Sequence, residues 1–214
     1  MPGHVWRILI FDFCMTIMVA EPLAPIELGR IGDLLNDAAS EFANHGCNDF
    51  GCRATAENKA LFIAIIQWQA GQTGGDPDPQ WIDYVEKVQA ENEQIYSFDN
   101  WAMGYFGQRC KRLAKNAASV SGLSSAELEM IAALLDVMVD FREIDLEDHG
   151  VTVDYTLNAA DENKRFIASV IKHEGSDGWE RMVEEVMRSN DEIAVPEHWI
   201  MCYFAGRCKE LAAR

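Results

Sequence analysis

Basic side chains are scarce in this chain. Its 214 residues carry 18 lysines and arginines against 35 aspartates and glutamates, which gives a formal net charge of -17 at pH 7. This excess of negative charge repels phosphate backbones and anionic membranes, so we expect neither direct nucleic-acid binding nor membrane binding. Residues 1–120 hold 15 acidic and 9 basic groups (net -6), whereas residues 121–214 hold 20 and 9 (net -11). We therefore expect a basic partner that contacts mainly the second half of the chain.

Cysteine is sparse as well. The six cysteines include no Cys-x-x-Cys pair and lack the density of a secreted disulfide scaffold, which favours a reducing cytoplasm. The apolar stretch within residues 1–25 is interrupted by Asp12 and is followed by no small-x-small cleavage site, so it does not predict a signal peptide. It is also too short and too interrupted for a membrane span. We expect an apolar extension or strand there.

Motifs of the common catalytic sites are missing too. The sequence contains no Gly-x-Ser-x-Gly, no Gly-rich phosphate loop that ends in Lys-Ser or Lys-Thr, and no His-Glu-x-x-His. These absences argue against a serine hydrolase, a P-loop nucleotide hydrolase and a zinc metalloprotease. The sequence therefore predicts a non-enzymatic protein without a cofactor.

An internal duplication dominates what is present. The segment WAMGYFGQRCKRLA at 101–114 returns 98 residues later as WIMCYFAGRCKELA at 199–212. Farther upstream, Glu-Asn-Lys at 57–59 matches 162–164 at an offset of 105, and Leu-Leu at 34–35 matches 134–135 at an offset of 100. A period near 100 residues indicates a duplicated domain rather than a solenoid. The predicted domains are an apolar extension (1–25), a first unit (26–117), a linker (118–122) and a second unit (123–214).

Hydrophobic periodicity predicts an all-α fold with about four helices in each unit. A turn-rich loop is expected over 45–55, between the first two helices. Ser124 and Glu127 have the spacing of a capping box, and Pro25 and Pro196 suit first helical positions. Asp99, Asn158 and Asp177 are predicted N-caps. The expected helices cover 25–44, 56–69, 80–95, 100–116, 125–145, 159–173, 178–190 and a last segment from Pro196.

The duplicated terminal helix carries two stripes. Met103, Phe106 and Cys110 recur at core spacing, so Cys110 and its copy Cys208 are predicted to be small buried groups rather than nucleophiles. Arg109 and its copy Arg207 lie on the neighbouring stripe, and a cation kept twice requires an anion. The duplicated carboxylates offer structural ion pairs, with an anionic ligand at each arginine as the alternative. The predicted ion-pair residues are Asp49, Glu57, Arg109, Asp154, Glu162 and Arg207.

One loop contains residue types that bind metals: His45, Cys47, Asp49 and Cys52. Imidazole, thiolate and carboxylate are all zinc ligands, but the spacing matches no standard zinc site and the second unit lacks both cysteines. We therefore predict no metal and expect a loop held by side-chain-to-backbone hydrogen bonds. The alternative function is a metal- or small-ligand-binding enzyme of unknown reaction, centred on His45, Cys47 and Asp49 with Glu57 nearby.

The helix expected from residue 125 to about 145, with its continuation to 149, carries the strongest functional signal. On a 100° wheel, its apolar residues share one side while five carboxylates, from Glu129 to Glu147, fall within a sector about 60° wide. Like charges four residues apart cost helix stability, so the row is not explained by folding. The alternative is a solvated face of an acidic protein. The predicted partner-binding residues are Glu129, Asp136, Asp140, Glu143, Asp145, Glu147, Asp148, Glu180 and Glu184.

Asn-His-Gly-Cys-Asn-Asp-Phe at 44–50, followed by Ala-Glu-Asn at 56–58 and Met-Gly-Tyr-Phe at 103–106, resembles a helical module of bacterial and phage-associated proteins for which no activity is established. The acidic, duplicated chain is also similar in character to phage-encoded anti-CRISPR proteins that mimic DNA. That likeness implies a monomeric inhibitor in the cytoplasm of a bacterial host. Its partner would be a basic protein or nucleoprotein complex, such as a CRISPR effector. A plain helical interaction module that self-associates through Trp81 or Trp179 is a further alternative.

Overall fold

The computed structural model describes residues 21–45, 49–88, 93–116, 122–150 and 152–214, without the side chains of residues 44, 45 and 145–149. Most of the predicted apolar extension and linker, and the centre of the His45–Cys47 loop, therefore lie outside the described residues.

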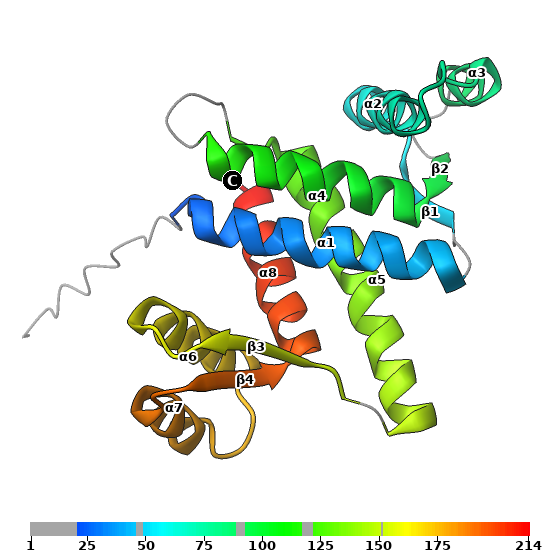
Figure 1. Cartoon of the computed structure of the whole chain (residues 1–214). Coiled ribbons are helices and arrows are strands. Elements are labelled where there is room, and N and C mark those ends of the chain that lie inside the picture. The colour runs from blue at the N-terminus through cyan, green and yellow to red at the C-terminus, as the bar shows by residue number, and fades with distance from the viewer. Residues whose placement is uncertain (1–20, 46–48, 89–92, 117–121, 151) are drawn as a thin grey trace, which may run out of the picture.

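The described ranges contain eight helices and four short strands, so the all-α class predicted from the sequence is confirmed (Figure 1). The same order of elements, α-β-α-α-β-α, occurs twice. The first unit consists of α1 (Pro25–His45), β1 (Asp49–Arg53), α2 (Ala56–Thr73), α3 (Pro79–Lys87), β2 (Gln94–Phe98) and α4 (Asp99–Lys115). The second consists of α5 (Ser125–His149), β3 (Asp154–Asn158), α6 (Asp161–Glu174), α7 (Trp179–Arg188), β4 (Glu192–Pro196) and α8 (Glu197–Ala212).

The strands correct the helical prediction. β1 pairs antiparallel with β2, with Asp49 opposite Phe98, and β3 pairs antiparallel with β4, with Asp154 opposite Pro196. β1 lies where we expected a loop, and β2 takes the end of the helix predicted over 80–95. Each strand has only five residues, so its alternation of buried and exposed side chains is too short to stand out in the sequence.

Two of the predicted helix starts are confirmed and two predicted N-caps are wrong. The Ser124–Glu127 capping box is confirmed, because the Glu127 amide donates to Ser124 Oγ at 3.2 Å and the Ser124 amide donates to Glu127 Oε2 at 2.8 Å. Pro25 begins α1 as predicted. The predicted caps Asn158 and Asp177 are wrong, since Ala160 caps α6 and Gly178 caps α7 in the left-handed region.

Two further starts move by one residue because β2 and β4 run directly into the helices that follow. Asp99 is the first residue of α4 rather than its cap, and Phe98 takes the cap position. Pro196 is the cap of α8 rather than its first helical residue.

Within each unit, the first and last helices pack side by side along their lengths, α1 with α4 and α5 with α8 (Figure 1). α1 crosses α4 closely at Gly32, where a Cβ would lie 2.9 Å from the Gly107 carbonyl oxygen. Cys110 and Cys208 are fully buried in this packing, as predicted. Burial raises the pKa of each thiol to about 12, which keeps both in the uncharged form that suits a core position.

The duplicated Asn-Lys pair is architectural. Asn58 Nδ2 donates to the Arg53 carbonyl at 2.9 Å, and Asn163 Nδ2 donates to the Asn158 carbonyl at 3.0 Å, so each asparagine fixes a helix to the end of the preceding strand. The lysine that follows bonds a carbonyl at the end of the next helix, Lys59 at α3 and Lys164 at α7. Retention of both residues in both units is thus explained by the same two contacts.

The duplicated arginines connect the two units to each other. Arg109 Nε of α4 lies 3.0 Å from Glu127 Oε1 of α5, and Arg207 Nε of α8 lies 3.6 Å from Glu27 Oε1 of α1. Glu27 is the copy of Glu127 and makes the same capping bond, accepting from the Ala24 amide at 2.8 Å. The two ion pairs are therefore reciprocal, as in an isologous interface.

These contacts correct the predicted ion pairs. The carboxylates assigned to the arginines are exposed and form no ion pair among the residues that the structure describes; they are Asp49, Glu57, Asp154 and Glu162. A duplication shows that the arginine and its anion are retained, but it does not show whether the contact lies within a unit or between units.

One hydrophobic core extends through both units. Phe42 of α1 and Phe141 of α5 meet across the boundary with ring centroids 5.0 Å apart. Beside them, Arg142 donates to both carboxylate oxygens of Glu41 at 2.9 and 2.7 Å, and to Glu197 of α8 at 3.1 Å. A bidentate ion pair thus supports the apolar contact between the units.

Candidate partner-binding surface

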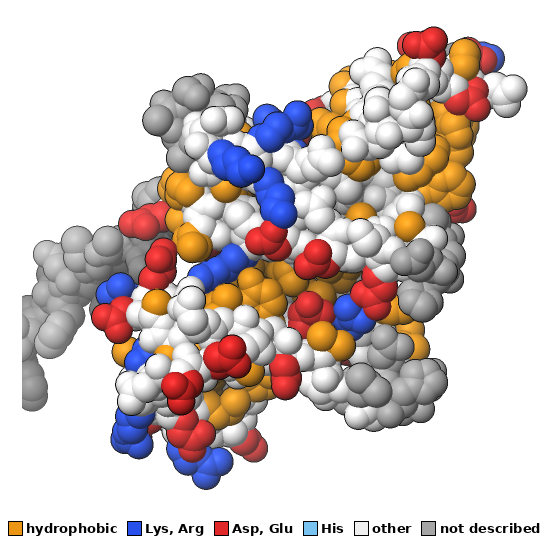
Figure 2. All heavy atoms as spheres, viewed as in Figure 1, with side chains coloured by type: hydrophobic (Ala, Val, Ile, Leu, Met, Phe, Trp, Pro, Cys, Tyr) orange, Lys and Arg blue, Asp and Glu red, His pale blue; other side chains and the backbone are white. Residues whose placement is uncertain are grey.

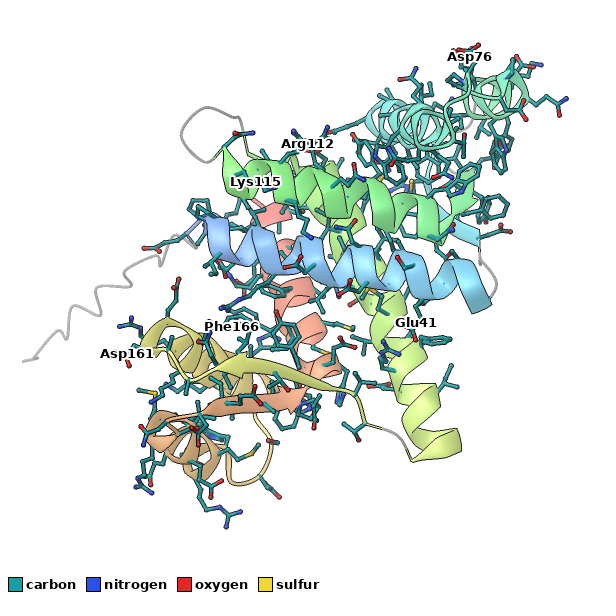
Figure 3. The ribbon with its side chains drawn as sticks, viewed as in Figure 1. Glu41, Asp76, Arg112, Lys115, Asp161 and Phe166 are labelled. Atoms are coloured by element: carbon teal, nitrogen blue, oxygen red, sulfur yellow. The ribbon has the colours of Figure 1, made fainter. Side chains whose placement is uncertain are left out.

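Charges are unevenly distributed over the protein. Figure 2 shows basic side chains gathered over α4, and Figure 3 places Arg112 on the side of α4 away from α1 and Lys115 at the C-terminal end of α4. Over the second unit, the same view shows many carboxylates interspersed with bases. The surfaces predicted to bind a basic partner therefore have to be judged helix by helix.

α5 separates apolar and acidic residues as predicted. Glu129, Asp140 and Glu143 are exposed, and Asp136 is half-buried. Asp145, Glu147 and Asp148 continue the helix, but their side chains lie outside the described part of the chain. The predicted apolar face is buried; its described members are Leu128, Ile131, Leu134, Leu135, Met138 and Val139.

Basic side chains of the protein itself neutralise only part of the negative charge of the acidic row. Lys209 of α8 lies 2.7 Å from Asp136 Oδ2. Arg142 is engaged by Glu41 and Glu197: burial lowers its pKa, but the hydrogen bond with Glu41 and the charge of Glu197 outweigh this and raise it. Glu129, Asp140 and Glu143 form no ion pair with any residue that the structure describes. Three carboxylates therefore remain available on this face of α5.

The α7 part of the predicted surface is different. Glu184 pairs with Arg188 at 2.9 Å, and Glu185 with Arg181 at 3.8 Å, so two carboxylates of this helix have arginine partners on the same helix. α7 lies on the far side of the two-stranded β3–β4 sheet from α5 (Figure 1). Glu180 and Glu184 consequently lie apart from the α5 row and do not extend it.

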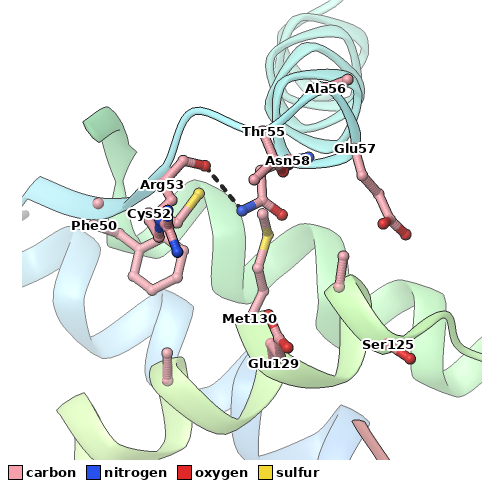
Figure 4. A pocket seen from close by; sticks show the side chains of 13 residues that line it. Phe50, Cys52, Arg53, Thr55, Ala56, Glu57, Asn58, Ser125, Glu129 and Met130 are labelled. Carbon is pink, nitrogen blue, oxygen red and sulfur yellow. Dashed lines mark hydrogen bonds between the residues drawn. The ribbon is translucent and has the colours of Figure 1, made fainter. Parts of the chain in front are cut away.

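A cavity of about 660 Å³ lies beside the first turns of α5, between this helix and the corner formed by β1 and α2 (Figure 4). We call it the junction cavity, since it lies where the two units meet. Glu57 and Asn58 contribute to it from α2, and Glu129 and Met130 from α5. Glu57, assigned from the sequence to an ion pair, and Glu129, assigned to the acidic row, thus share one site.

The junction cavity also has an aromatic wall and a thiol. Phe50, Cys52 and Arg53 of β1 line it. Burial raises the pKa of the Cys52 thiol to about 12, so this sulfur is protonated at neutral pH. Sequence reasoning missed Met130 and Asn58 as site residues, because it assigned no role to the first and interpreted the second as part of the duplicated scaffold.

The alternative site around His45 is divided by the strand. Asp49 and Cys52 lie on opposite faces of β1, since side chains alternate along a strand. Cys52 lines the junction cavity, whereas Asp49 lines a separate cavity of about 540 Å³ with Trp81, Tyr84 and Tyr96. The side chains of His45 and Cys47 lie outside the described residues. Elsewhere in the described chain, no group of three histidine, cysteine or acidic side chains could hold a metal ion.

Trp81 and Trp179, considered for self-association, are both half-buried. Trp81 packs against Phe98 and Trp101 with ring centroids 5.7 Å apart in each pair. Trp179 packs against the hydrophobic core and lies 5.9 Å from Lys172 Nζ. Packing within each unit therefore buries a large part of both indole rings.

No protein-family model, curated protein or solved structure matches this chain. Among the described helices, none has the length and apolar character needed to cross a membrane.

Proposed function

We propose that this protein is a non-enzymatic binding protein whose acidic face on α5 occupies a basic groove of its partner. The partner is a protein or nucleoprotein complex whose groove ordinarily holds nucleic acid, such as a bacterial defence complex of the CRISPR type. The observation that carries the proposal is the set of three exposed carboxylates without an internal counter-ion, Glu129, Asp140 and Glu143. The formal charge of -17 supports it, because it steers the chain toward positive surfaces.

The mechanism is competition. Asp140 and Glu143 are three residues apart on one helix, which separates them by about 4.5 Å along its axis and places both on the same side. A row of fixed carboxylates presents a basic groove with negative charge where phosphates would lie, and so displaces nucleic acid. Association is then driven by charge, and salt weakens it.

The test compares charge reversal on two helices. The double variant Asp140→Lys/Glu143→Lys changes the net charge by +4, and the matched control Glu180→Lys/Glu184→Lys makes the same change on α7. Partners are captured from a bacterial lysate, identified and purified, and binding is then measured directly. We expect the α5 variant to lose binding by at least about tenfold and the α7 variant to retain most of it, with unchanged thermal melts for both.

Two further measurements bear on the mechanism. Raising the salt concentration is expected to weaken binding steeply, and the partner's own nucleic acid is expected to compete for the complex. Equal losses for the two double variants, or a complex that persists in molar salt, would contradict the proposal.

A further inference from the structure

The two junctions between the units are related by the duplication, and one of them is filled by an arginine. Arg30 of α1 is 6% exposed and lies against α6. Its Nη2 donates to Asn163 Oδ1 at 2.5 Å, and its guanidinium carbon lies 3.9 Å from the centroid of the Phe166 ring. Figure 3 shows Phe166 in the space between α6 and α1. The second unit's strand-helix corner is thus closed by a guanidinium from the first unit.

At the other junction, methionine takes the place of this arginine. α1 and α5 correspond at an offset of 100, so Arg30 corresponds to Met130. β1–α2 and β3–α6 correspond at an offset of 105, so Asn163 corresponds to Asn58 and Glu162 to Glu57. Met130, Asn58 and Glu57 all line the junction cavity. The cavity therefore occupies the position that the Arg30 side chain fills in the other half of the molecule.

The polar groups that receive a guanidinium are present in the empty junction. Asn163 Nδ2 donates to a strand carbonyl while its Oδ1 accepts from Arg30. Asn58 Nδ2 makes the same bond to the Arg53 carbonyl, and no donor in the described chain reaches its Oδ1. The Asn58 side chain points toward Met130 in Figure 4. An acceptor is therefore held in position by the same scaffold, without its donor.

The charge of the cavity favours a cation. The Glu57 and Glu129 carboxylates line it, and Gly29 stands at the position of Glu129 in the other half, so this junction has one more carboxylate than its copy. Arg53 also lines it and offsets one of the two negative charges. The Phe50 ring adds an aromatic wall suited to a planar guanidinium. Two carboxylates, an amide oxygen and an aromatic ring suit a guanidinium better than an ammonium group, which is a compact, strongly hydrated charge.

We propose that the junction cavity binds an arginine side chain of the partner, which takes the position that Arg30 occupies in the other half. This inference rests on the proposed function, because it identifies the residue by which a basic partner is anchored. The guanidinium pairs with Glu57 and Glu129 and donates to Asn58 Oδ1, while its alkyl chain lies along Met130.

The experiment uses N-acetyl-arginine methylamide as the probe and N-acetyl-lysine methylamide as its control. The full-length protein is labelled at its methionine methyl groups, Met130 is assigned with the Met130→Leu variant, and each probe is titrated by NMR. We expect the arginine probe to shift the Met130 resonance saturably with a Kd on the order of 1 mM, and the lysine probe to bind at least about threefold more weakly. No saturable shift, or equal binding of both probes, would overturn the proposal.

Two variants test the residues. Glu57→Gln/Glu129→Gln is expected to weaken binding of the arginine probe by at least about fivefold, since two partly solvated ion pairs are lost. Met130→Arg supplies an internal guanidinium and is expected to raise the thermal melting temperature and abolish probe binding. Undiminished probe binding by either folded variant contradicts the site. If Met130→Arg does not fold, the Glu57→Gln/Glu129→Gln result still decides.

The same probe separates this proposal from the proposed function. Asp140→Lys/Glu143→Lys is expected to lose the partner while it retains the arginine probe. If wild type binds the probe but charge reversal on α5 leaves partner binding intact, the acidic-face function fails and the arginine site stands. If reversal abolishes partner binding and wild type ignores the probe, the arginine site fails and the function stands.

Discussion

Arg109 Nε of α4 lies 3.0 Å from Glu127 Oε1 of α5, and the same contact is made in reverse by Arg207 and Glu27 at 3.6 Å. Glu127 has two tasks, since one oxygen caps its own helix and the other binds the arginine of the opposite unit. A glutamate in the first turn of a helix is favoured there by the helix dipole as well. The pairs therefore couple the start of one unit to the end of the other.

Removal of either arginine is expected to destabilise the protein. Arg109→Met leaves Glu127, whose side chain is 9% exposed, without its counter-ion, and should cost about 1–3 kcal/mol. Arg207→Met should cost less, because its pair is longer. Lys87→Met is the control, since its pair with Asp83 is largely exposed and should change stability by less than about 0.5 kcal/mol. Urea unfolding measures all three, and equal effects would contradict the interpretation.

Arg142 makes the most extensive ion-pair contacts between the units. Arg142→Met leaves Glu41 and Glu197 without a cation in a partly buried site, and should cost about 2–4 kcal/mol. Burial already raises the pKa of Glu197, with Arg142 opposing the rise, so this variant should raise it further. An acid with a raised folded-state pKa loses stability as pH rises through that pKa, so the loss should be larger at pH 7 than at pH 4.

A second substitution tests this explanation. Glu197→Gln in the Arg142→Met background removes one stranded charge and should restore part of the stability at pH 7. Arg188→Met is the matched control, because its pair with Glu184 is exposed, and a cost below about 0.5 kcal/mol is expected. A loss for Arg142→Met that does not depend on pH would show that the charges of Glu41 and Glu197 are not its cause.

Two glycines on α1 should respond to alanine in opposite directions. At Gly32 a Cβ would lie 2.9 Å from the Gly107 carbonyl oxygen and 2.7 Å from Lys111 Cγ, so we expect Gly32→Ala to cost about 1–3 kcal/mol. At Gly29 the nearest atom to such a Cβ is Ala114 Cβ at 3.9 Å, so alanine fits and its higher helix propensity should stabilise by up to about 1 kcal/mol. Thermal unfolding by circular dichroism distinguishes the two, and a stabilising Gly32→Ala would show that α1 and α4 separate without penalty.

Three of the four described cysteines, Cys52, Cys110 and Cys208, should be unreactive in the native protein. Burial raises the pKa values of Cys52, Cys110 and Cys208 from 9.0 to about 12, so roughly one thiol in ten thousand is ionised at pH 8. Iodoacetamide should modify them only after unfolding, as read by mass spectrometry of peptides. The unfolded chain ionises first as pH rises, so stability should fall from pH 9 upward. Rapid native alkylation of Cys52 would show that its thiol is more accessible than the structure indicates.

The core of the terminal helices could be predicted from the sequence, because Met103, Phe106 and Cys110 recur at helical spacing and all three are buried. The strands could not, since five residues beside turn formers give too short an alternation. β1 in particular contains Gly51, and its ladder depends on Gln94–Phe98, more than 40 residues later. Pairing at that distance leaves no local pattern in either segment.

The candidate site was predictable only in part. Exposure of Glu129, Asp140 and Glu143 follows from helical periodicity, which the wheel captures. The ion pair between Asp136 and Lys209 depends on how α8 packs against α5. The spacing of residues within α5 does not predict it. The junction cavity exists because Met130 stands where the other unit has Arg30. The sequence shows this difference, but only the structure shows that α5 faces the β1–α2 corner as α1 faces the β3–α6 corner.

The reciprocal form of the contacts between the units has a consequence for how this protein arose. A shorter ancestor with a single unit would have joined a twin through two identical junctions, each sealed or each open. Covalent fusion removes that identity requirement, because the two sites are then encoded separately and mutate independently. In this chain one junction is closed by its own Arg30 and the corresponding junction holds a cavity, so the attachment point proposed above exists only once and has a direction.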